Sequence, residues 1–320
     1  MKLLVTGGAG FIGSNFILHM MNTHPDIEII NLDILTYAGN LNNLKSVERD
    51  PGYTLVKGDI CSLDIVNSIL DTHEIDAIIH FAAESHVDRS ITDASEFVRT
   101  NVLGTFNLLE CARHHPVRKF IHISTDEVYG STMKGSFTEN DILSPSSPYS
   151  ASKAGSDLLA LSYFKTYNLP VIITRCTNNF GPYQYPEKLI PLFVTNLIEG
   201  KKVPIYGTGK NVRDWIHVRD HCRAVEFILS RGITGEIYNI GGGNEKTNIE
   251  ITKKILTILK KDDAMIEYVT DRPGHDFRYS LDCSKLSKMG WRPRYSFEGG
   301  LQDTVDWYST NEWWWKPLKK

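Results

Sequence analysis

The segment that most constrains the fold is residues 6–13, Thr-Gly-Gly-Ala-Gly-Phe-Ile-Gly, which joins a short apolar run to a helix-forming stretch. Its glycines at positions 7, 10 and 13 give the spacing G-x-x-G-x-x-G, a relative of the dinucleotide-binding fingerprint. Gly7 permits a tight turn, Gly10 lets the backbone approach a pyrophosphate, and Gly13 lets the helix pack closely on the strand. A strand–helix turn without a ligand could use the same glycines, so the surrounding sequence decides between the two interpretations.

An acidic residue at the expected distance favours the dinucleotide site. Asp33 ends the second apolar run, about 20 residues after the loop. A carboxylate there accepts a hydrogen bond from a ribose 2′-hydroxyl and repels a 2′-phosphate, so the sequence predicts NAD rather than NADP. The loop residues Phe11 and Ile12 open the helix whose N-terminus would face the phosphates. Asp59 and Ile60 follow the third apolar run and are expected near the adenine.

Short apolar runs rich in β-branched residues alternate with segments of helical length through the first half of the chain. Such runs are typical of strands buried on both faces of a parallel sheet. They occupy residues 3–6, 27–32, 53–56, 77–81, 120–124 and 171–175, with one more at 237–240. Helices are expected over 62–72, 100–114, 189–199, 249–260 and 301–307.

This alternation predicts an α/β fold, a Rossmann-type doubly wound parallel sheet with a smaller α/β C-terminal substrate lobe. The expected NAD-binding domain spans residues 1–177, with a return crossing near 214–243. Residues 178–320 then form mainly the substrate-binding lobe.

Composition excludes several classes of function. The 320 residues carry 35 Lys and Arg against 38 Asp and Glu, so the net charge of −3 provides no basic surface for nucleic acid. No apolar run approaches the roughly 18–20 residues of a membrane span, and no signal peptide is recognised. The five cysteines are odd in number and lack a C-x-x-C pair, which argues against disulfides and zinc and favours a cytoplasmic protein.

Tyr149 and Lys153 form a Y-x-x-x-K pair that places a phenol and an ammonium on one face of a helix. A nearby cation stabilises a phenolate and is expected to lower the pKa of the tyrosine from about 10. Such a tyrosine can remove a proton from a substrate hydroxyl while hydride leaves the same carbon. An exposed surface pair is the alternative, but the dinucleotide loop upstream favours catalysis.

Three polar residues, Thr125, Asp126 and Glu127, follow the fifth predicted strand. Ligands of open α/β sheets bind at this edge, where Thr125 could hydrogen-bond the same hydroxyl as Tyr149. Two adjacent carboxyl groups push their pKa values apart, so one can act as an acid and the other as a base. A solvated acidic turn or a helix N-cap is the alternative interpretation.

Taken together, these motifs resemble the extended short-chain dehydrogenase/reductase superfamily and, more narrowly, the dTDP-glucose 4,6-dehydratase family. The resemblance covers essentially the whole chain and is carried by residues 6–13, 33–41, 82–90, 124–130, 149–153, 178–191, 213–215 and 272–276. The pair Asp126 and Glu127 marks the dehydratases, because epimerases and decarboxylases of the superfamily lack it.

The resemblance implies a role for each catalytic residue. Tyr149 would deprotonate the C4 hydroxyl as hydride passes to NAD, with Lys153 holding the nicotinamide ribose and Thr125 orienting the 4-oxygen. Glu127 would take the C5 proton, and Asp126 would protonate the C6 hydroxyl so that water leaves. Hydride return to C6 gives a 4-keto-6-deoxy sugar nucleotide, a precursor of deoxysugars such as rhamnose in polysaccharides.

The resemblance also implies the binding contacts and the assembly. Further cofactor contacts are expected from Ala82, Ala83, Ser85 and Thr100. Substrate contacts are expected from Ser85, His86, Thr125, Asn178, Lys188, Leu189, Pro204, Tyr206, Arg213, Asn248, Arg272 and His275. The family implies a homodimer built from the helix over 100–114 and the helix that carries Tyr149.

Some features leave alternatives open. Thr177 and Phe277 depart from the Ser and the basic residue expected in the family, so UDP-glucose or UDP-N-acetylglucosamine remain candidate substrates. A 4-epimerase and a non-catalytic NAD sensor are more distant alternatives. His217 and His221 are spaced as a helical pair, but no Glu follows His217, so no metal site is predicted. The aromatic segment 313–315 is expected to pack on the lobe or on a partner subunit.

Overall fold

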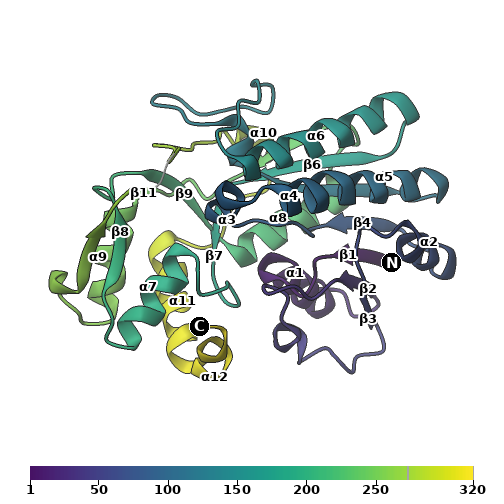
Figure 1. Ribbon diagram of the computed structural model, residues 1–320. Helices are drawn as coiled ribbons and strands as arrows, with labels where there is room; N and C mark the ends of the chain where they lie inside the picture. The colour runs from purple at the N-terminus through teal and green to yellow at the C-terminus, as the bar shows by residue number, and fades with distance from the viewer. Residues whose placement is uncertain (272–273, 320) are drawn as a thin grey trace.

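The computed structural model describes residues 1–271 and 274–319, and it contains one large and two small sheets (Figure 1). The large sheet has seven strands in the order β10-β6-β5-β4-β1-β2-β3, and every pairing in it is parallel. Its strands are β1 (Lys2–Thr6), β2 (Glu28–Asp33), β3 (Tyr53–Lys57), β4 (Ala77–His80), β5 (Lys119–Thr125), β6 (Val171–Cys176) and β10 (Ile237–Ile240). The predicted Rossmann-type sheet is confirmed, and each of the seven predicted strands is present.

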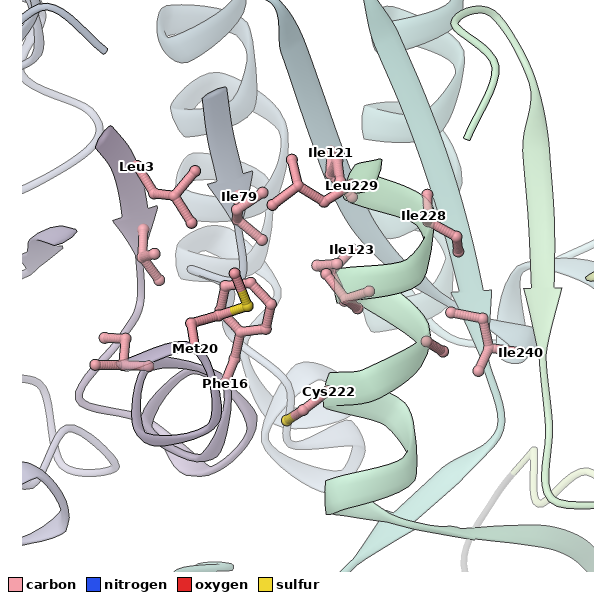
Figure 2. Packing of buried hydrophobic residues seen from close by; sticks show 14 of the residues in the cluster. Leu3, Phe16, Met20, Ile79, Ile121, Ile123, Cys222, Ile228, Leu229 and Ile240 are labelled. Carbon is pink, nitrogen blue, oxygen red and sulfur yellow. The ribbon is translucent and has the colours of Figure 1, made fainter. Parts of the chain in front are cut away.

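Helices cover both faces of the large sheet, which makes it doubly wound (Figure 1). On one face, α1 (Phe11–Thr23) and α8 (Val218–Arg231) pack against the strands, and Figure 2 shows Phe16 and Met20 of α1 and Cys222 and Ile228 of α8 in the apolar cluster of this face. The helices of the opposite face are α2 (Leu63–Thr72), α5 (Thr105–His114) and α6 (Pro148–Tyr167). Near α5 and α6 lie the shorter α3 (Val87–Thr92) and α4 (Ser95–Phe97).

The helix predicted over 100–114 is interrupted near its start. Val98–Gly104 forms a π-helical turn, η2, and α-helical geometry begins only at Thr105. Thr105 Oγ1 donates to the carbonyl of Asn101 at 2.6 Å, a side-chain bond that competes with the regular backbone ladder. The wider turn carries Thr100 toward the carboxyl edge of the sheet.

The smaller lobe contains a three-stranded sheet, β11-β9-β7, and a two-stranded sheet, β12-β8. The strands are β7 (Asn178–Phe180), β8 (Val203–Tyr206), β9 (Val212–His217), β11 (Glu245–Thr247) and β12 (Ile266–Val269). The helices of this lobe are α7 (Leu189–Ile198), α9 (Asn248–Ile258), α11 (Phe297–Thr310) and α12 (Glu312–Trp315), and its short 3-10 turns are η4 (Asp263–Met265) and η5 (Lys316–Leu318). Helix α10 (Ser284–Lys288) instead packs beside β10 of the large sheet, and the 3-10 turns η1 (Leu41–Leu44) and η3 (Asp126–Tyr129) contact α1 and α6. The predicted smaller α/β lobe is confirmed, whereas the domain boundary at residue 177 stays a prediction.

His217 lies in a different element from the one predicted. His217 was expected in a helix with His221, but it is the last residue of β9 and caps α8 by accepting from the Arg219 N–H. The His217 ring stacks on Tyr295 at a centroid distance of 4.1 Å, while His221 hydrogen-bonds Asn179. Residues 1–271 and 274–319 bring together no group of three or more His, Cys, Asp or Glu side chains suited to a metal ion.

The aromatic segment near the C-terminus packs as expected on the smaller lobe. Trp314 and Trp315 are buried in the apolar cluster formed by α7, α9 and α11, and Trp313 is 57% exposed. None of the helices in the described part of the chain combines the length and apolar character that a membrane crossing requires.

A buried ion pair ties helix α6 to the sheet. Asp157 on α6 accepts from Arg175 Nε on β6 at 2.8 Å, and both side chains are almost fully buried. Arg175 Nη1 also donates to the hydroxyl of Tyr129 at 2.7 Å, and Tyr129 donates to Asn239 on β10 at 3.0 Å. One network therefore fixes α6, η3 and two strands relative to one another.

We expect Asp157→Ala to lower the free energy of unfolding by about 3–5 kcal/mol, because it leaves the Arg175 guanidinium buried without its counter-charge. Chemical denaturation followed by circular dichroism measures this loss. The matched control is Glu312→Ala, which removes an exposed i,i+4 partner of Lys316 and should cost no more than about 0.5 kcal/mol. Equal losses in the two variants would contradict the proposed importance of the network.

Candidate active site

A cavity of about 360 Å³ lies at the carboxyl ends of the parallel strands. This is the edge at which open α/β sheets bind ligands. All the residues predicted to contact the cofactor line it, namely Gly7, Gly10, Phe11, Ile12, Gly13, Asp33, Asp59, Ile60, Ala82, Ala83, Ser85, Thr100, Tyr149 and Lys153. Thr125, Asp126 and Glu127 line the same cavity, so the predicted cofactor and catalytic residues converge on one space.

The glycine loop has the geometry that a pyrophosphate requires. Gly7 has a φ of 70°, and a Cβ on it would lie 2.6 Å from the backbone of Ala82. A Cβ on Gly13 would lie 2.3 Å from the Gly7 carbonyl oxygen, so α1 packs on the loop only because residue 13 has no side chain. Gly10 precedes the first turn of α1, whose N–H groups point out of the helix N-terminus. These features fit a dinucleotide.

Asp33 links the glycine loop to the end of β2. Its carboxylate accepts from the Ala9 N–H at 2.9 Å and from the Leu35 N–H at 2.8 Å, one bond to each oxygen. Burial raises the pKa of Asp33 above its ordinary value, while the two backbone donors act in the opposite direction. Each carboxylate oxygen can still accept a second hydrogen bond, such as one from a ribose hydroxyl.

Helix α6 presents Tyr149 and Lys153 to the cavity. The helix begins in a capping box, in which Ser147 accepts from the Ser150 N–H and Pro148 occupies the first turn. Lys153 Nζ donates to the Ile123 carbonyl at 2.7 Å, and burial lowers the pKa of Lys153 to about 8. This ammonium is therefore held at the end of β5, beside the acidic turn.

The expectation that Lys153 lowers the pKa of Tyr149 is wrong for the polypeptide itself. Burial raises the pKa of Tyr149 well above its ordinary value, and the negative charge of Glu127 adds to this effect. The Lys153 ammonium forms its hydrogen bond with a backbone carbonyl instead of the phenol. A positive charge brought into the cavity by a ligand would oppose both effects on Tyr149.

Asp126 and Glu127 occupy distinct environments within one turn of η3. Asp126 is buried, and burial followed by the charge of Glu127 raises its pKa well above the ordinary range. Thr125 Oγ1 donates to Asp126 Oδ1 at 3.2 Å, whereas Asp126 Oδ2 is buried without a hydrogen-bond partner among the described residues. This environment favours the protonated form of the Asp126 carboxyl over the carboxylate.

The predicted substrate residues divide into two groups. Ser85, Thr125, Asn178 and Lys188 line the cavity. Lys188 Nζ donates to the Ser85 carbonyl at 2.9 Å, and the side-chain oxygen of Asn178 is buried without a partner in the described structure. His86, Leu189, Pro204, Tyr206, Arg213, Asn248 and His275 do not line it, and Arg272 lies outside the described residues.

Arg213 lies near enough to Asp126 to act on its charge, although it is outside the cavity lining. Its guanidinium donates to the carbonyls of Val212 and Asp276 and stacks over the Tyr279 ring at 4.2 Å. Its positive charge opposes the rise in the pKa of Asp126. Its contact with a substrate phosphate stays a prediction.

A cluster of Tyr37, Arg89 and Glu187 beside the cavity has no counterpart among the predicted site residues. Glu187 accepts from the hydroxyl of Tyr37 at 3.0 Å and from Arg89 Nη2 at 2.9 Å. The Arg89 guanidinium lies 3.7 Å from the centroid of the Tyr37 ring. Because Tyr37 and Glu187 are 150 positions apart, no local spacing could have indicated this contact.

Comparisons with known proteins agree with the geometry. The family model described as GDP-mannose 4,6 dehydratase matches residues 4–304. The dTDP-glucose 4,6-dehydratase of Streptomyces niveus is 52% identical over 100% of this chain and 96% of its own length. DesIV, the dTDP-glucose 4,6-dehydratase of Streptomyces venezuelae solved with NAD bound, is 55% identical with a TM-score of 0.97, covering 100% of both chains.

A third relative shows how far the fold alone extends. UDP-glucose 4-epimerase of Thermotoga maritima, solved with UDP-glucose, is 30% identical, with a TM-score of 0.91 and coverage of 98% of this chain and 100% of its own. Because epimerases share the fold, the acidic pair after β5 carries more information about chemistry than the architecture does.

We expect Asp126→Asn to raise the free energy of unfolding at pH 7 by about 0.5–2 kcal/mol and to change it little at pH 4. The pKa of Asp126 is raised in the folded protein, so the unfolded chain loses this proton first as pH rises. Above a pH of about 3.9, the pKa of an aspartate in the unfolded chain, ionisation therefore favours the unfolded state. The uncharged amide removes this loss of stability.

Urea denaturation at the two pH values measures the effect. Asp141→Asn is the matched control, because hydrogen bonds from Thr138 lower the pKa of Asp141 instead of raising it. Removing the Asp141 carboxylate should not stabilise the protein at pH 7. A loss of stability in Asp126→Asn at pH 7 would show that the carboxyl is ionised and paired in the folded protein.

Proposed function

Because the chain belongs to the nucleotide-sugar 4,6-dehydratase family, in its dTDP-glucose branch, we propose that it converts dTDP-glucose to dTDP-4-keto-6-deoxyglucose and water with NAD as a regenerated cofactor. The observation that carries this proposal is the pairing of buried Asp126 with Glu127 beside Tyr149 in the glycine-loop cavity. An acid, a base and an oxidation centre are the groups that this elimination requires.

The first step oxidises C4 of the glucose to a ketone by removing the hydrogen on C4 and the proton of the C4 hydroxyl. NAD, when bound, accepts the C4 hydrogen as hydride and later returns it to C6. The Tyr149 phenolate takes the C4 hydroxyl proton, and Thr125 orients the oxygen by a hydrogen bond. Lys153, held by the Ile123 carbonyl, would hold the nicotinamide ribose of bound NAD and supply a positive charge on the same helix as Tyr149. The positive charge of the cofactor opposes the burial that raises the pKa of Tyr149.

The second step eliminates water across C5 and C6. The new C4 ketone acidifies the C5 proton, and the Glu127 carboxylate removes it. Asp126 gives its proton to the C6 hydroxyl, which leaves as water. Hydride then arrives at C6 and a proton at C5, so the sugar loses one water in total and ends as a 4-keto-6-deoxy sugar.

The choice of nucleotide and sugar rests on contacts beyond the acidic turn. Asn178 and Lys188 line the cavity and offer an amide and an ammonium to a diphosphate, while the charge of Arg213 acts on Asp126 from outside the lining. A pocket for one thymine methyl contributes about 1–3 kcal/mol to discrimination against uracil. dTDP-glucose is favoured over UDP-sugars because the relatives of highest identity reported above carry that name.

We expect the wild-type enzyme to convert dTDP-glucose, in preference to UDP-glucose and UDP-N-acetylglucosamine, to a product lighter by one water. Asp126→Asn and Glu127→Gln should each lower the rate of dehydration by about 10²–10⁴-fold, because each removes a positioned acid or base. Mass spectrometry of the products from the three donors, incubated separately, measures both effects.

The two variants should still form the C4 ketone, which is visible as reduced cofactor absorbance. Their unimpaired dehydration would refute the proposed roles of the acidic pair. An epimer of unchanged mass from the wild type would instead place the chain with the 4-epimerases, and no reaction despite bound NAD would favour a sensor.

The proposal extends to assembly and location. A homodimer is supported by apolar side chains left exposed on adjacent helices, with Val98, Leu103 and Phe106 on η2 and α5 and Leu158 on α6. These helices run side by side along one side of the large sheet (Figure 1). A cytoplasmic location is supported by five unpaired cysteine thiols.

We expect Leu158→Asp to convert the dimer to a monomer, because it buries a charge in the apolar contact between subunits. Light scattering after gel filtration should show a fall from about twice to about once the chain mass of 36.2 kDa. Ile142→Asp, in an exposed loop with 86% of that residue accessible, should leave the mass unchanged. A dimer that survives Leu158→Asp would exclude this face.

A further inference from the structure

We propose that Trp314, in the C-terminal aromatic segment, is a positioning residue for the NAD-binding loop and acts through Asn43. The inference rests on the proposed function for the identity of the ligand. None of the catalytic steps uses this tryptophan, and its side chain does not line the cavity. It lies on α12, which Figure 1 shows near the chain end, on the side of the smaller lobe that faces α1 and β2.

A chain of two buried hydrogen bonds connects this helix to the glycine loop. Trp314 Nε1 donates to Asn43 Oδ1 at 2.8 Å, and Asn43 Nδ2 donates to the carbonyl of Ala9 at 3.0 Å. The three residues are at most 2% exposed, so water does not replace these bonds readily. Ala9 stands between the glycines of the phosphate-binding loop, 305 positions before Trp314.

The chemistry of the groups fixes the orientation of the Asn43 amide. An indole N–H can only donate, and a backbone carbonyl can only accept. Asn43 must therefore present its oxygen to Trp314 and its amino group to Ala9. Without the indole donor, the Asn43 amide oxygen is left buried and unpaired. The amide orientation that donates to the Ala9 carbonyl is then no longer favoured over the flipped orientation.

The Ala9 peptide is in turn held on both sides. Its N–H donates to Asp33, the predicted ribose-binding carboxylate, and its carbonyl also accepts from the Asn40 N–H at 2.9 Å. A shift of this peptide moves Gly10, which opens helix α1, relative to Asp33. Trp314 therefore helps to set the distance between the pyrophosphate site and the ribose site.

Trp314 is also anchored from the opposite side. Its ring meets Tyr183 at a centroid distance of 5.7 Å and Trp307 at 5.1 Å, both edge-on. Tyr183 lines the cavity. The indole is thus held by the smaller lobe while its N–H reaches the segment after β2, so the C-terminal segment joins the two parts of the molecule beside the cofactor.

The test is the exchange of NAD bound to the holoenzyme for isotopically labelled NAD, followed by mass spectrometry of the released nucleotide. We expect Trp314→Phe and, separately, Asn43→Asp to speed exchange by about tenfold, near the upper range for one buried hydrogen bond. Asn43→Asp replaces the donor facing Ala9 by an oxygen. The double variant should exchange no faster than Asn43→Asp, because both changes break one chain of bonds.

Two tryptophans in the same segment serve as matched controls. Trp315→Phe also removes a buried indole donor, but that N–H bonds the carbonyl of Tyr308 at 2.7 Å and leads away from the loop. Trp313→Phe changes an exposed ring. Both should exchange NAD within twofold of wild type, although Trp315→Phe should lower the melting temperature.

Exchange in Trp314→Phe and Asn43→Asp within twofold of wild type would overturn the inference while leaving the dehydratase proposal intact. An equal acceleration in Trp315→Phe would also overturn it, because the effect would then be a general loss of stability. A wild-type protein that binds no NAD would overturn both proposals.

Discussion

The parallel pairing of all seven strands of the large sheet is the constraint on which the site depends. Parallel strands bring their carboxyl ends to one edge, so residues that follow six different strands meet there. The glycine loop, Asp33, the Thr125–Glu127 turn and helix α6 each reach the cavity for this reason. β10 closes the sheet on the far side of β6 and supplies Asn239 to the buried network that holds α6.

Burial separates the tasks of chemically similar groups within this site. Asp126 and Glu127 are neighbours in sequence, yet the structure encloses Asp126 and raises its pKa well above the ordinary range. Burial acts in the opposite direction on Lys153 and lowers its pKa to about 8. The pKa of Tyr149 is raised, first by burial and then by the charge of Glu127. Under the proposed function, Asp126 is the proton donor and Tyr149 is a base whose ionisation the positive charge of bound NAD would favour.

The two parts of the molecule are joined around the cavity by contacts distant in sequence. Glu187 accepts from Tyr37 and Arg89 at the cavity mouth, and Trp314 reaches the glycine loop through Asn43. Glu187 and Trp314 both lie after residue 178. Their partners Tyr37 and Asn43 follow Asp33 in the sequence, and Arg89 lies on α3. A site at such a junction responds to changes in either part, which is the physical basis for expecting distant residues to alter cofactor exchange.

The sequence by itself determined the alternation of buried strands and helices, the glycine loop with Asp33, and the placement of Tyr149 and Lys153 on one helix, because these depend on local spacing and on continuous apolar runs. It also predicted Asp126 and Glu127 as the acid and base of the proposed elimination. It did not reveal the short strands of the smaller lobe, the end of β9 at His217, or the direction of the pKa shift of Tyr149. These depend on which residues from far along the chain surround each group. Tertiary structure alone decided the burial of Asp126, the Glu187 cluster and the path from Trp314 to Ala9, because desolvation and long-range hydrogen bonds exist only once the chain has folded.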